Sequence, residues 1–263
     1  MTSEPKVNSG QKIAIVTGGS RGIGRNTAVS LAERGVDLII TYQSNRAEAD
    51  AAVTAIEVMG RTAVALQLEV GDIGSLSDFA DRVRATLQDT WGRSDFDYLV
   101  NNAGSHRRGR IGEITETDFD YLCNIHFKGV FFLIQELLPL MTDGGRIINV
   151  SSALTRFITP GSTNSAVYAS MKGAVEVLTR YMAQELGSRG ITVNAVAPGA
   201  IETDFGGGVV RDNREVNRLI ASHTALGRAG LTDDIGPMIA SLLSDANRWV
   251  TGQRIEASGG MFL

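Results

Sequence analysis

The chain has few cysteines and no long apolar stretch. It contains one cysteine, Cys123, which excludes an internal disulfide and favours a reducing compartment such as the cytoplasm. No stretch reaches the roughly 20 apolar residues that a membrane span needs. The start of the chain is polar, so residues 1–10 predict a flexible N-terminus and not a signal peptide. We therefore expect a cytoplasmic protein that does not enter a membrane.

The chain also lacks a strong charge of one sign. With 25 Lys and Arg against 29 Asp and Glu, its formal charge is −4, which gives no reason to expect nucleic-acid binding. His126 has no acid or second histidine at ligand spacing, and no metal site is visible elsewhere. At 263 residues the chain is long enough for a large core. We expect a single domain over residues 11–263.

Short β-branched apolar runs alternate with amphipathic stretches along the whole chain. The expected strands are residues 12–17, 36–42, 62–70, 98–102, 145–152, 191–197 and 254–257. The expected helices are residues 23–34, 46–59, 75–90, 117–141, 168–186 and 233–243. Repeated alternation of this kind predicts an α/β protein with parallel strands and right-handed crossovers. In such sheets ligands bind beyond the carboxyl ends of the strands.

A glycine-rich turn joins the first expected strand to the first expected helix. It reads Gly18-Gly-Ser-Arg-Gly22-Ile-Gly24. Strand, glycine turn and helix form the context of a dinucleotide-binding turn, because glycines let the backbone approach a pyrophosphate. The N-terminus of the helix adds N–H groups and a positive dipole. The turn therefore predicts a dinucleotide site.

The end of the second strand distinguishes between the two nicotinamide cofactors. An acid there would bind the ribose 2′-hydroxyl and repel a 2′-phosphate. The sequence has no acid at that end, and Asp37 lies at the opposite end of the strand. Arg21 and Arg46 are suited to phosphate, and Ser44 and Asn45 can donate hydrogen bonds. We therefore favour NADPH over NADH.

Tyr168 and Lys172 are four residues apart in an expected helix, so they lie on one face about one turn apart. An ammonium about 4–6 Å from a phenol lowers the phenol's pKa by roughly 1–3 units, toward the range useful for proton transfer. Ser152, at the end of the fifth strand, places a hydroxyl at the same sheet edge. Together these residues predict an acid–base site.

In combination, these patterns resemble the short-chain dehydrogenase/reductase family. The motifs are Thr17-Gly18-x-x-x-Gly22-x-Gly24, Asn101-Asn-Ala-Gly104, Asn124, Ser152, Tyr168-x-x-x-Lys172 and Pro198-Gly199. The resemblance covers the chain from about Lys12. The Arg-Gly-Ile-Gly turn and Leu226-Gly-Arg228 look most like 3-oxoacyl-carrier-protein reductases and their ketone-reducing relatives.

The resemblance implies a single-domain Rossmann fold, a doubly wound seven-stranded parallel sheet in the order 3-2-1-4-5-6-7 with helices on both faces. It implies that Tyr168 donates a proton to the substrate carbonyl and that Lys172 lowers the pKa of Tyr168 and binds the nicotinamide ribose. Ser152 would hold the carbonyl oxygen, and Asn124 would anchor a water linked to Lys172. Relatives are commonly homotetramers packed through the helices that carry Asn124 and Tyr168.

The resemblance also implies a set of cofactor contacts. These are Gly18, Ser20, Arg21, Gly22, Ile23, Gly24, Ser44, Asn45, Arg46, Glu69, Val70, Asn102, Ala103, Gly104, Tyr168, Lys172, Pro198, Gly199, Ile201 and Thr203. Glu69 stands where relatives usually carry an Asp near the adenine, and Ala257-Ser258 replaces a more usual Val-Asp. The longer carboxylate side chain of Glu69 alters that adenine contact.

The substrate is a small carbonyl compound whose identity the sequence leaves open. His106, Leu154, Phe157 and Phe205 are expected pocket residues, and a triple glycine predicts a lid over residues 204–228. This mixed lining fits an acyl thioester, a cyclic ketone or a sugar-like ketone. A basic rim at residues 105–110, if it takes part, would favour an acidic carrier or phosphorylated substrate.

The predicted function is NADPH-dependent reduction of a ketone or 3-oxoacyl carbonyl. Two alternatives stay open. One is an NAD-dependent alcohol or steroid dehydrogenase of the same family, which cofactor preference would distinguish. The other is a non-catalytic dinucleotide sensor, which would usually lack part of the Asn124, Ser152, Tyr168 and Lys172 set.

Overall fold

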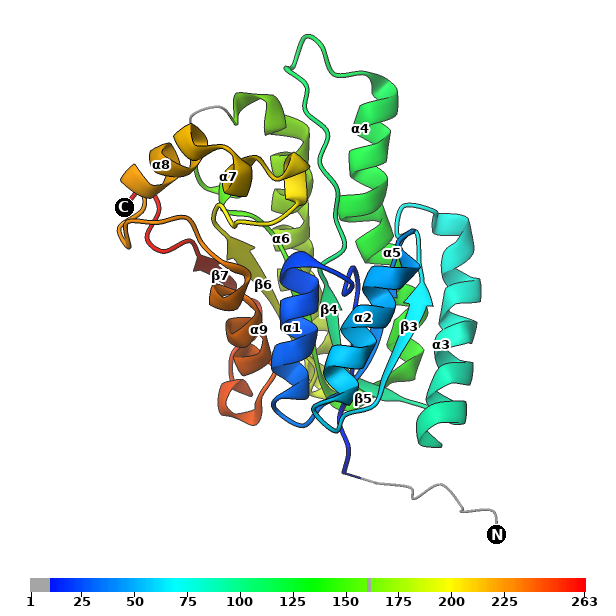
Figure 1. Cartoon of the computed structure of the whole chain (residues 1–263). Helices are drawn as coiled ribbons and strands as arrows, with labels where there is room; N and C mark the ends of the chain where they lie inside the picture. Colours follow the sequence, from blue (N-terminus) through cyan, green and yellow to red (C-terminus); the bar gives the residue numbers. More distant parts are fainter. Residues whose placement is uncertain (1–9, 160–161) are drawn as a thin grey trace.

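The computed structural model describes residues 10–159 and 162–263, and within them seven strands form one parallel sheet (Figure 1). The order is β3-β2-β1-β4-β5-β6-β7, as predicted. The strands are β1 (Ile13–Val16), β2 (Asp37–Tyr42), β3 (Ala63–Gln67), β4 (Phe96–Asn101), β5 (Met141–Val150), β6 (Thr192–Pro198) and β7 (Arg254–Ala257). Nearly all of the segment predicted to be flexible, residues 1–10, lies outside the described residues.

Helices cover both faces of the sheet (Figure 1). They are α1 (Gly22–Ala32), α2 (Arg46–Glu57), α3 (Leu76–Trp91), α4 (Glu116–Cys123), α5 (Gly129–Leu137), α6 (Ala166–Leu186), α7 (Val209–Asp212), α8 (Arg214–Ser222) and α9 (Gly236–Leu242). One core cluster joins the sheet to α1, α2 and α9, and a second joins it to α3, α5 and the end of α6. In the described ranges, no helix is long and apolar enough to cross a bilayer.

The two core clusters follow from the alternation of side chains along each strand. In β1, Ile13 and Ile15 belong to one cluster, while Ala14 and Val16 belong to the other. All four residues are fully buried. A strand covered on both faces needs apolar residues at every position, which is why the sequence shows continuous apolar runs instead of strict alternation.

The single helix predicted over residues 117–141 is wrong in detail. The structure has α4, a π-helical segment (Asn124–Lys128), α5 and a short 3₁₀ turn before β5 begins at Met141. In the π segment the Gly129 N–H donates to the Asn124 carbonyl, five residues back. Gly129 packs so closely that an added Cβ would lie 2.3 Å from the Val70 carbonyl oxygen. π segments of one turn often mark functional sites.

A buried chain of hydrogen bonds connects the sheet to α6. The Asn101 amide on β4 donates to Asn149 on β5 at 2.9 Å. The Asn149 amide in turn donates to the Thr179 hydroxyl on α6 at 3.0 Å. The Thr179 hydroxyl donates to the Val175 carbonyl at 2.8 Å. Because these polar groups are shielded from water, each needs its partner.

Candidate active site

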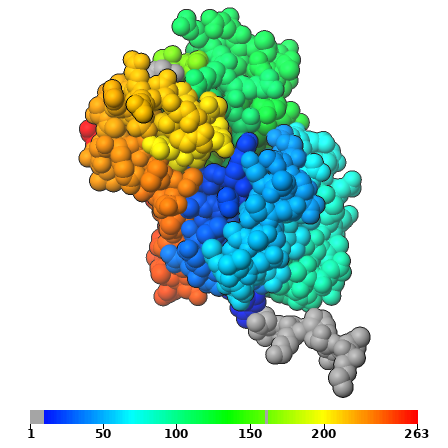
Figure 2. Space-filling model, viewed as in Figure 1, coloured from blue at the N-terminus to red at the C-terminus, as the bar shows by residue number. Residues whose placement is uncertain are grey.

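A cavity of about 590 Å³ lies beyond the carboxyl ends of the strands. The segments that follow β1, β2, β4, β5 and β6 border it, together with the start of α6. In Figure 2 the yellow and orange segment after β6 lies beside the green segment after β4 on one side of the molecule. This is the edge at which doubly wound sheets bind ligands.

The glycine turn forms one wall of this cavity. Gly18 and Gly22 have φ values of +63° and +56°, which favour glycine. The Gly18 N–H donates to the Thr41 hydroxyl at 3.0 Å. Among the described residues, no side chain caps the N-terminus of α1, and Ile23 of its first turn borders the cavity. Uncapped N–H groups and a close backbone approach fit a pyrophosphate.

The turn is tied to the segment that follows β4. The Thr17 hydroxyl accepts hydrogen bonds from the backbone N–H groups of Asn102 and Ala103, at 2.9 and 3.0 Å. The Asn102 amide donates to the Thr17 carbonyl at 2.9 Å. Gly24 lies behind the turn, where an added Cβ would lie 2.2 Å from the Gly18 carbonyl oxygen. Gly24 therefore lets α1 pack against the turn and does not itself line the cavity.

The two arginines proposed for phosphate lie in different places. Arg21 borders the cavity, as do Ser44 and Asn45. Arg46 is not on the cavity wall, and its Nε donates to the Asp50 carboxylate at 2.7 Å on the exposed face of α2. The i, i+4 spacing on a helix explains this pairing.

Glu69 borders the cavity, but its carboxylate already has partners. It accepts from the Gln43 side-chain amide and from the Gly71 N–H, the latter at 3.1 Å. Val70 borders the cavity beside it. Asp37 lies at the far end of β2, as predicted, and accepts from the Trp91 indole N–H at 2.9 Å.

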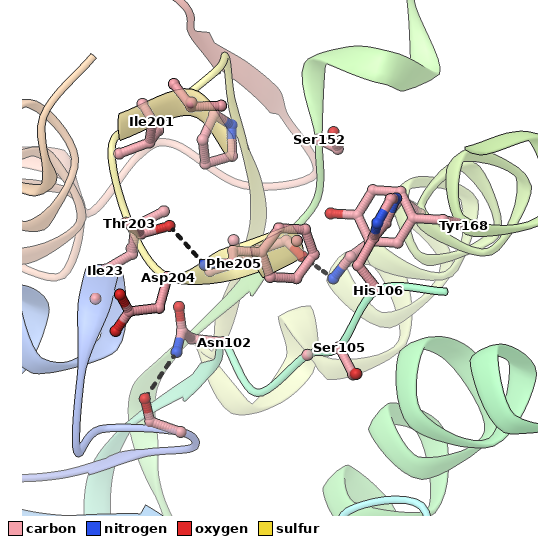
Figure 3. A pocket seen from close by; sticks show the side chains of 18 of the residues that line it. Ile23, Asn102, Ser105, His106, Ser152, Tyr168, Ile201, Thr203, Asp204 and Phe205 are labelled. Carbon is pink, nitrogen blue, oxygen red and sulfur yellow. Dashed lines mark hydrogen bonds between the residues drawn. The ribbon is translucent and has the colours of Figure 1, made fainter. Parts of the chain in front are cut away.

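Ser152, Tyr168 and Lys172 meet at the opposite wall and are all less than a tenth exposed. Figure 3 shows Ser152 and Tyr168 on one side of the pocket, with Ile23 and Asn102 across from them. The Lys172 ammonium lies 5.9 Å from the centroid of the Tyr168 ring and donates to the Val150 carbonyl at 2.7 Å. Ser152 follows β5, so strand and helix deliver the three groups to one place.

Burial is the main influence on the pKa values of Tyr168 and Lys172. Removal from water raises the pKa of Tyr168 to about 12, and hydrogen bonding with Ser152 acts in the opposite direction. Burial lowers the pKa of Lys172 to about 8. The expected lowering of the Tyr168 pKa by Lys172 is not found: burial is the larger influence, and the Lys172 ammonium donates to the Val150 carbonyl. Tyr168 is a neutral phenol at neutral pH and retains a proton that it can donate.

The predicted site residues border the cavity with three exceptions, Gly24, Arg46 and Asn124. Asn124 is half-buried at the start of the π segment and does not line the described cavity wall. His126, two residues further, does line it and is fully buried. The sequence shows only that His126 lacks a metal partner, and nothing in the sequence indicates the π segment that turns it inward.

Aromatic rings surround Tyr168 and extend away from it. The His106 ring meets the Tyr168 ring edge-on at 5.4 Å, and Phe205 lies 5.8 Å from Tyr168 between ring centroids (Figure 3). Phe157 and Phe262, with ring centroids 5.2 Å apart, extend this group of rings, and we call the whole group the aromatic arm. The predicted pocket residues His106, Phe157, Phe205 and Leu154 all line the cavity.

The C-terminal side of this arm was missed by the sequence analysis. Phe262 and His223 stack with centroids 4.8 Å apart, and both border the cavity. A bridge between Thr224 and Met261 brings the end of the chain back to the segment after α8. No local pattern marks this contact, because it joins segments that are distant in the sequence.

Comparison with known proteins agrees with this fold. A family model described as enoyl-(acyl-carrier-protein) reductase matches residues 18–262. The chain is 38% identical over 255 residues to the 3-oxoacyl-[acyl-carrier-protein] reductase FabG of Staphylococcus aureus, covering 96% of this chain and 98% of the relative. The chain belongs to the short-chain dehydrogenase/reductase family, as its motifs predicted.

Two solved structures are similar over nearly the whole chain. The reductase LugOII, described as catalysing keto-reduction at C1 during lugdunomycin biosynthesis, has a TM-score of 0.88 and 39% identity, covering 95% of this chain and 96% of that chain. The angucycline C-6 ketoreductase LanV with bound NADP has a TM-score of 0.89 and 36% identity, covering 95% of each chain.

Proposed function

We propose that the protein is an NADPH-dependent ketoreductase in which Tyr168 donates the proton. The observation that carries the proposal is a buried phenol held beside Ser152 and Lys172, across one cavity from an uncapped glycine turn. This pairing of a positioned acid with a nucleotide cradle suits carbonyl reduction. A non-catalytic dinucleotide sensor would need the glycine turn that binds the nucleotide, but it would not need Tyr168 as a proton donor.

Residues around the glycine turn would hold the cofactor. Gly18 to Ile23 would bind the pyrophosphate, Ser44 and Asn45 the adenosine, and Lys172 the nicotinamide ribose, with Glu69 close to the adenine. Val70, Ala103, Gly104, Pro198, Gly199, Ile201 and Thr203 complete the cavity wall on this side. When bound, the cofactor supplies the hydride.

A phosphorylated cofactor is supported by charge. The end of β2 carries no acid, and Arg21 borders the cavity. The similar ketoreductase LanV was crystallised with NADP. We assign the 2′-phosphate contact to Arg21, because Arg46 is paired with Asp50.

The chain's own groups account for the proton side of the reaction. The Ser152 hydroxyl donates a hydrogen bond to the carbonyl oxygen, and the Tyr168 phenol gives its proton as negative charge develops there. Because both residues are buried, these dipoles act with little competition from water, which strengthens them. The Lys172 ammonium stabilises the phenolate that is left behind.

The aromatic arm supports a flat, ring-containing ketone as substrate. Rings at His106, Phe205 and Phe262 offer faces and edges to a planar molecule. An acidic carrier would depend on Arg108, which borders the cavity, since Arg107 on the rim is bonded to the Asp118 carboxylate at 2.6 Å and lies over the Tyr121 ring. The keto-reduction named for LugOII and LanV concerns natural products and agrees with this choice.

Residues 204–228 would act as a lid within a single domain of residues 11–263. Gly206, Gly207 and Gly208 all have positive φ, a conformation in which the backbone can change direction without side-chain strain. The two short helices α7 and α8 follow, and Val209 and Ile220 border the cavity. Closure of this segment would exclude water.

A homotetramer is the proposed assembly, and the reduced cytoplasm the proposed location. Exposed apolar side chains lie on the outer faces of α5 and α6, where Phe131 is 38%, Val177 45% and Tyr181 72% exposed. Such patches favour association. Light scattering on the purified protein should give four times the chain mass, and a monomer mass would contradict the assembly.

The function is tested by following NADPH oxidation with a panel of ketones. The panel contains bicyclic and tricyclic ring ketones, an acetoacetyl thioester and a sugar ketone, each assayed with NADPH and NADH. We expect the highest kcat/KM for a ring ketone with NADPH. Preference for NADH would favour the alternative dehydrogenase, and tight NADPH binding without turnover would favour the sensor.

Tyr168→Phe is the decisive variant in this assay. It removes one hydroxyl, and we expect turnover to fall by roughly 10²–10⁴ while NADPH still binds. Tyr98→Phe is the matched control, because Tyr98 is buried in β4 away from the cavity. Near-normal turnover in Tyr168→Phe would refute the proposed mechanism.

A further inference from the structure

The family resemblance gives a catalytic role to Asn124, but in this structure His126, and not Asn124, lines the described cavity wall. Asn124 opens the π segment, is half-buried and does not line the cavity within the described residues. His126 is 0% exposed and lines the cavity. The extra residue in a π turn rotates the following side chains relative to a regular helix, and here His126 faces the reacting group.

His126 packs directly on the catalytic phenol. Its ring is perpendicular to the Tyr168 ring, with centroids 5.0 Å apart. The preferred edge-to-face geometry of two rings restricts how Tyr168 can tilt. The fit behind His126 is tight as well, since a Cβ on Gly104 would lie 2.9 Å from its Cε1.

One nitrogen of His126 has a partner that determines the tautomer. Nε2 lies 2.6 Å from the Ser105 carbonyl oxygen and 3.4 Å from the Ser105 backbone nitrogen. The shorter contact needs a hydrogen on Nε2, because a carbonyl can only accept, so Nε2 donates. The ring is neutral, because burial, and then the charge of Lys172, lower the pKa of His126 well below its usual value. Nδ1 therefore bears a lone pair and can only accept.

The other nitrogen is buried without a hydrogen bond. Nδ1 has no partner among the residues that the structure describes. A buried acceptor left unsatisfied costs roughly 1–3 kcal/mol, so native proteins usually provide water for it. The charge of Lys172 acts on the His126 ring. The Lys172 ammonium has three hydrogens, and within residues 10–159 and 162–263 one of them is used, by the Val150 carbonyl.

We propose that His126 is a positioning residue of the catalytic group, whose Nδ1 accepts a hydrogen bond from a water held by the Lys172 ammonium. This inference rests on the proposed function, and it transfers to His126 the water-anchoring role that the resemblance gives to Asn124. Through this water His126 fixes the position of the Lys172 ammonium, and through ring packing it restricts the tilt of Tyr168. No proton passes through its ring, because Nε2 stays bonded to Ser105.

Three variants separate this role from a purely structural one. His126→Phe keeps a ring against Tyr168 but removes the acceptor, and His126→Asn restores an amide acceptor. We expect His126→Phe to lower kcat by roughly tenfold to a hundredfold, the loss of one buried hydrogen bond. KM and the Kd for NADPH should change little, and His126→Asn should recover most of the rate. Asn124→Ala should lose less than His126→Phe.

Nitrogen NMR of the ¹⁵N-histidine-labelled protein gives a readout that does not depend on turnover. The His126 signal, assigned by its loss in the variants, should show a neutral ring with hydrogen on Nε2 at neutral pH. A hydrogen on Nδ1, or a protonated ring, would overturn the inference. Equal rates in His126→Phe and wild type, or a larger loss in Asn124→Ala, would overturn it too.

The two proposals fail in different ways. If the wild-type protein reduces none of the ketones, the proposed function fails, and the NMR measurement still decides the state of His126. If the wild type is active and His126→Phe does not fold, the comparison of His126→Asn with Asn124→Ala and the NMR spectrum decide the role. Thermal unfolding of each variant shows which case applies.

Discussion

Replacing Lys172 with methionine should make the protein more stable and inactive. Burial lowers the pKa of Lys172 from 10.5 to about 8. The unfolded chain therefore holds a proton at this site over a pH range in which the folded chain releases it. Charge burial of this kind is a stability cost that is fully present below about pH 8 and disappears as the pH approaches 10.5. Methionine has similar length and carries no charge.

The size of the effect follows from the two pKa values. At about 1.4 kcal/mol per pKa unit, the interval corresponds to about 3 kcal/mol at neutral pH. Methionine loses the hydrogen bond to the Val150 carbonyl, which offsets about 1 kcal/mol. The net gain of about 2 kcal/mol should raise the Tm by roughly 5 °C for a chain of this length.

The pH dependence gives the sharper test. Because the unfolded state binds more protons, the free energy of unfolding of the wild type should rise from about pH 8 to pH 10.5. Lys172→Met should lack this rise. Above about pH 10 stability should fall in both, since burial raises the pKa of Tyr168 to about 12 and folding there retains a proton.

The measurement is denaturant unfolding of the cofactor-free protein at a series of pH values. Lys12→Met is the contrasting control, because hydrogen bonding to Asp97 raises the pKa of Lys12, so that its removal should destabilise the fold at neutral pH. If Lys172→Met is less stable than wild type at neutral pH, or if the two pH profiles run parallel, the desolvation argument is refuted.

Three further predictions concern the cofactor wall and the substrate. Arg21→Ala should raise the Kd for NADPH by roughly 10- to 100-fold and leave NADH unchanged, whereas Arg46→Ala should affect both weakly; equal losses in titrations would contradict the assignment. Gly24→Ala should destabilise α1 and abolish nucleotide binding. Gly173→Ala, which has open space at its Cβ, should raise the Tm slightly, and similar melting curves for the two variants would contradict the packing argument. Ser152→Ala should reduce kcat by roughly 10²-fold with KM little changed, and a pure KM effect would contradict its role.

Much of the fold was predictable because parallel sheets leave strong local signals. Buried strands are continuous apolar runs, and β7 begins and ends where the sequence predicted, at Arg254 and Ala257. The glycine turn, Ser152 and the Tyr168–Lys172 spacing predicted the two walls of the cavity. Each of these signals lies within a few residues, and the alternating topology then brings them to one edge.

The features that were missed depend on contacts between distant segments. Residues 124–128 form a π turn where Gly129 packs against the Val70 carbonyl, so Asn124 turns away from the cavity and His126 turns toward it. The direction of the Tyr168 pKa was wrong because spacing gives the distance to Lys172 but not the loss of water. The phosphate contact predicted for Arg46 stays a prediction, and in the structure Arg46 pairs with Asp50 one turn later.

The buried chain from Asn101 through Asn149 to Thr179 has a consequence for catalysis. Thr179 is two turns beyond Lys172, so both project from the same side of α6. A helix packed by apolar contacts alone can roll in its groove, but directional bonds to the sheet allow only one rotational setting. The buried hydrogen bonds between the sheet and α6 thus determine the orientation of the Tyr168 phenol and the Lys172 ammonium. Substitutions at Asn149 or Thr179 should misalign the chemistry while leaving every surface that touches substrate intact.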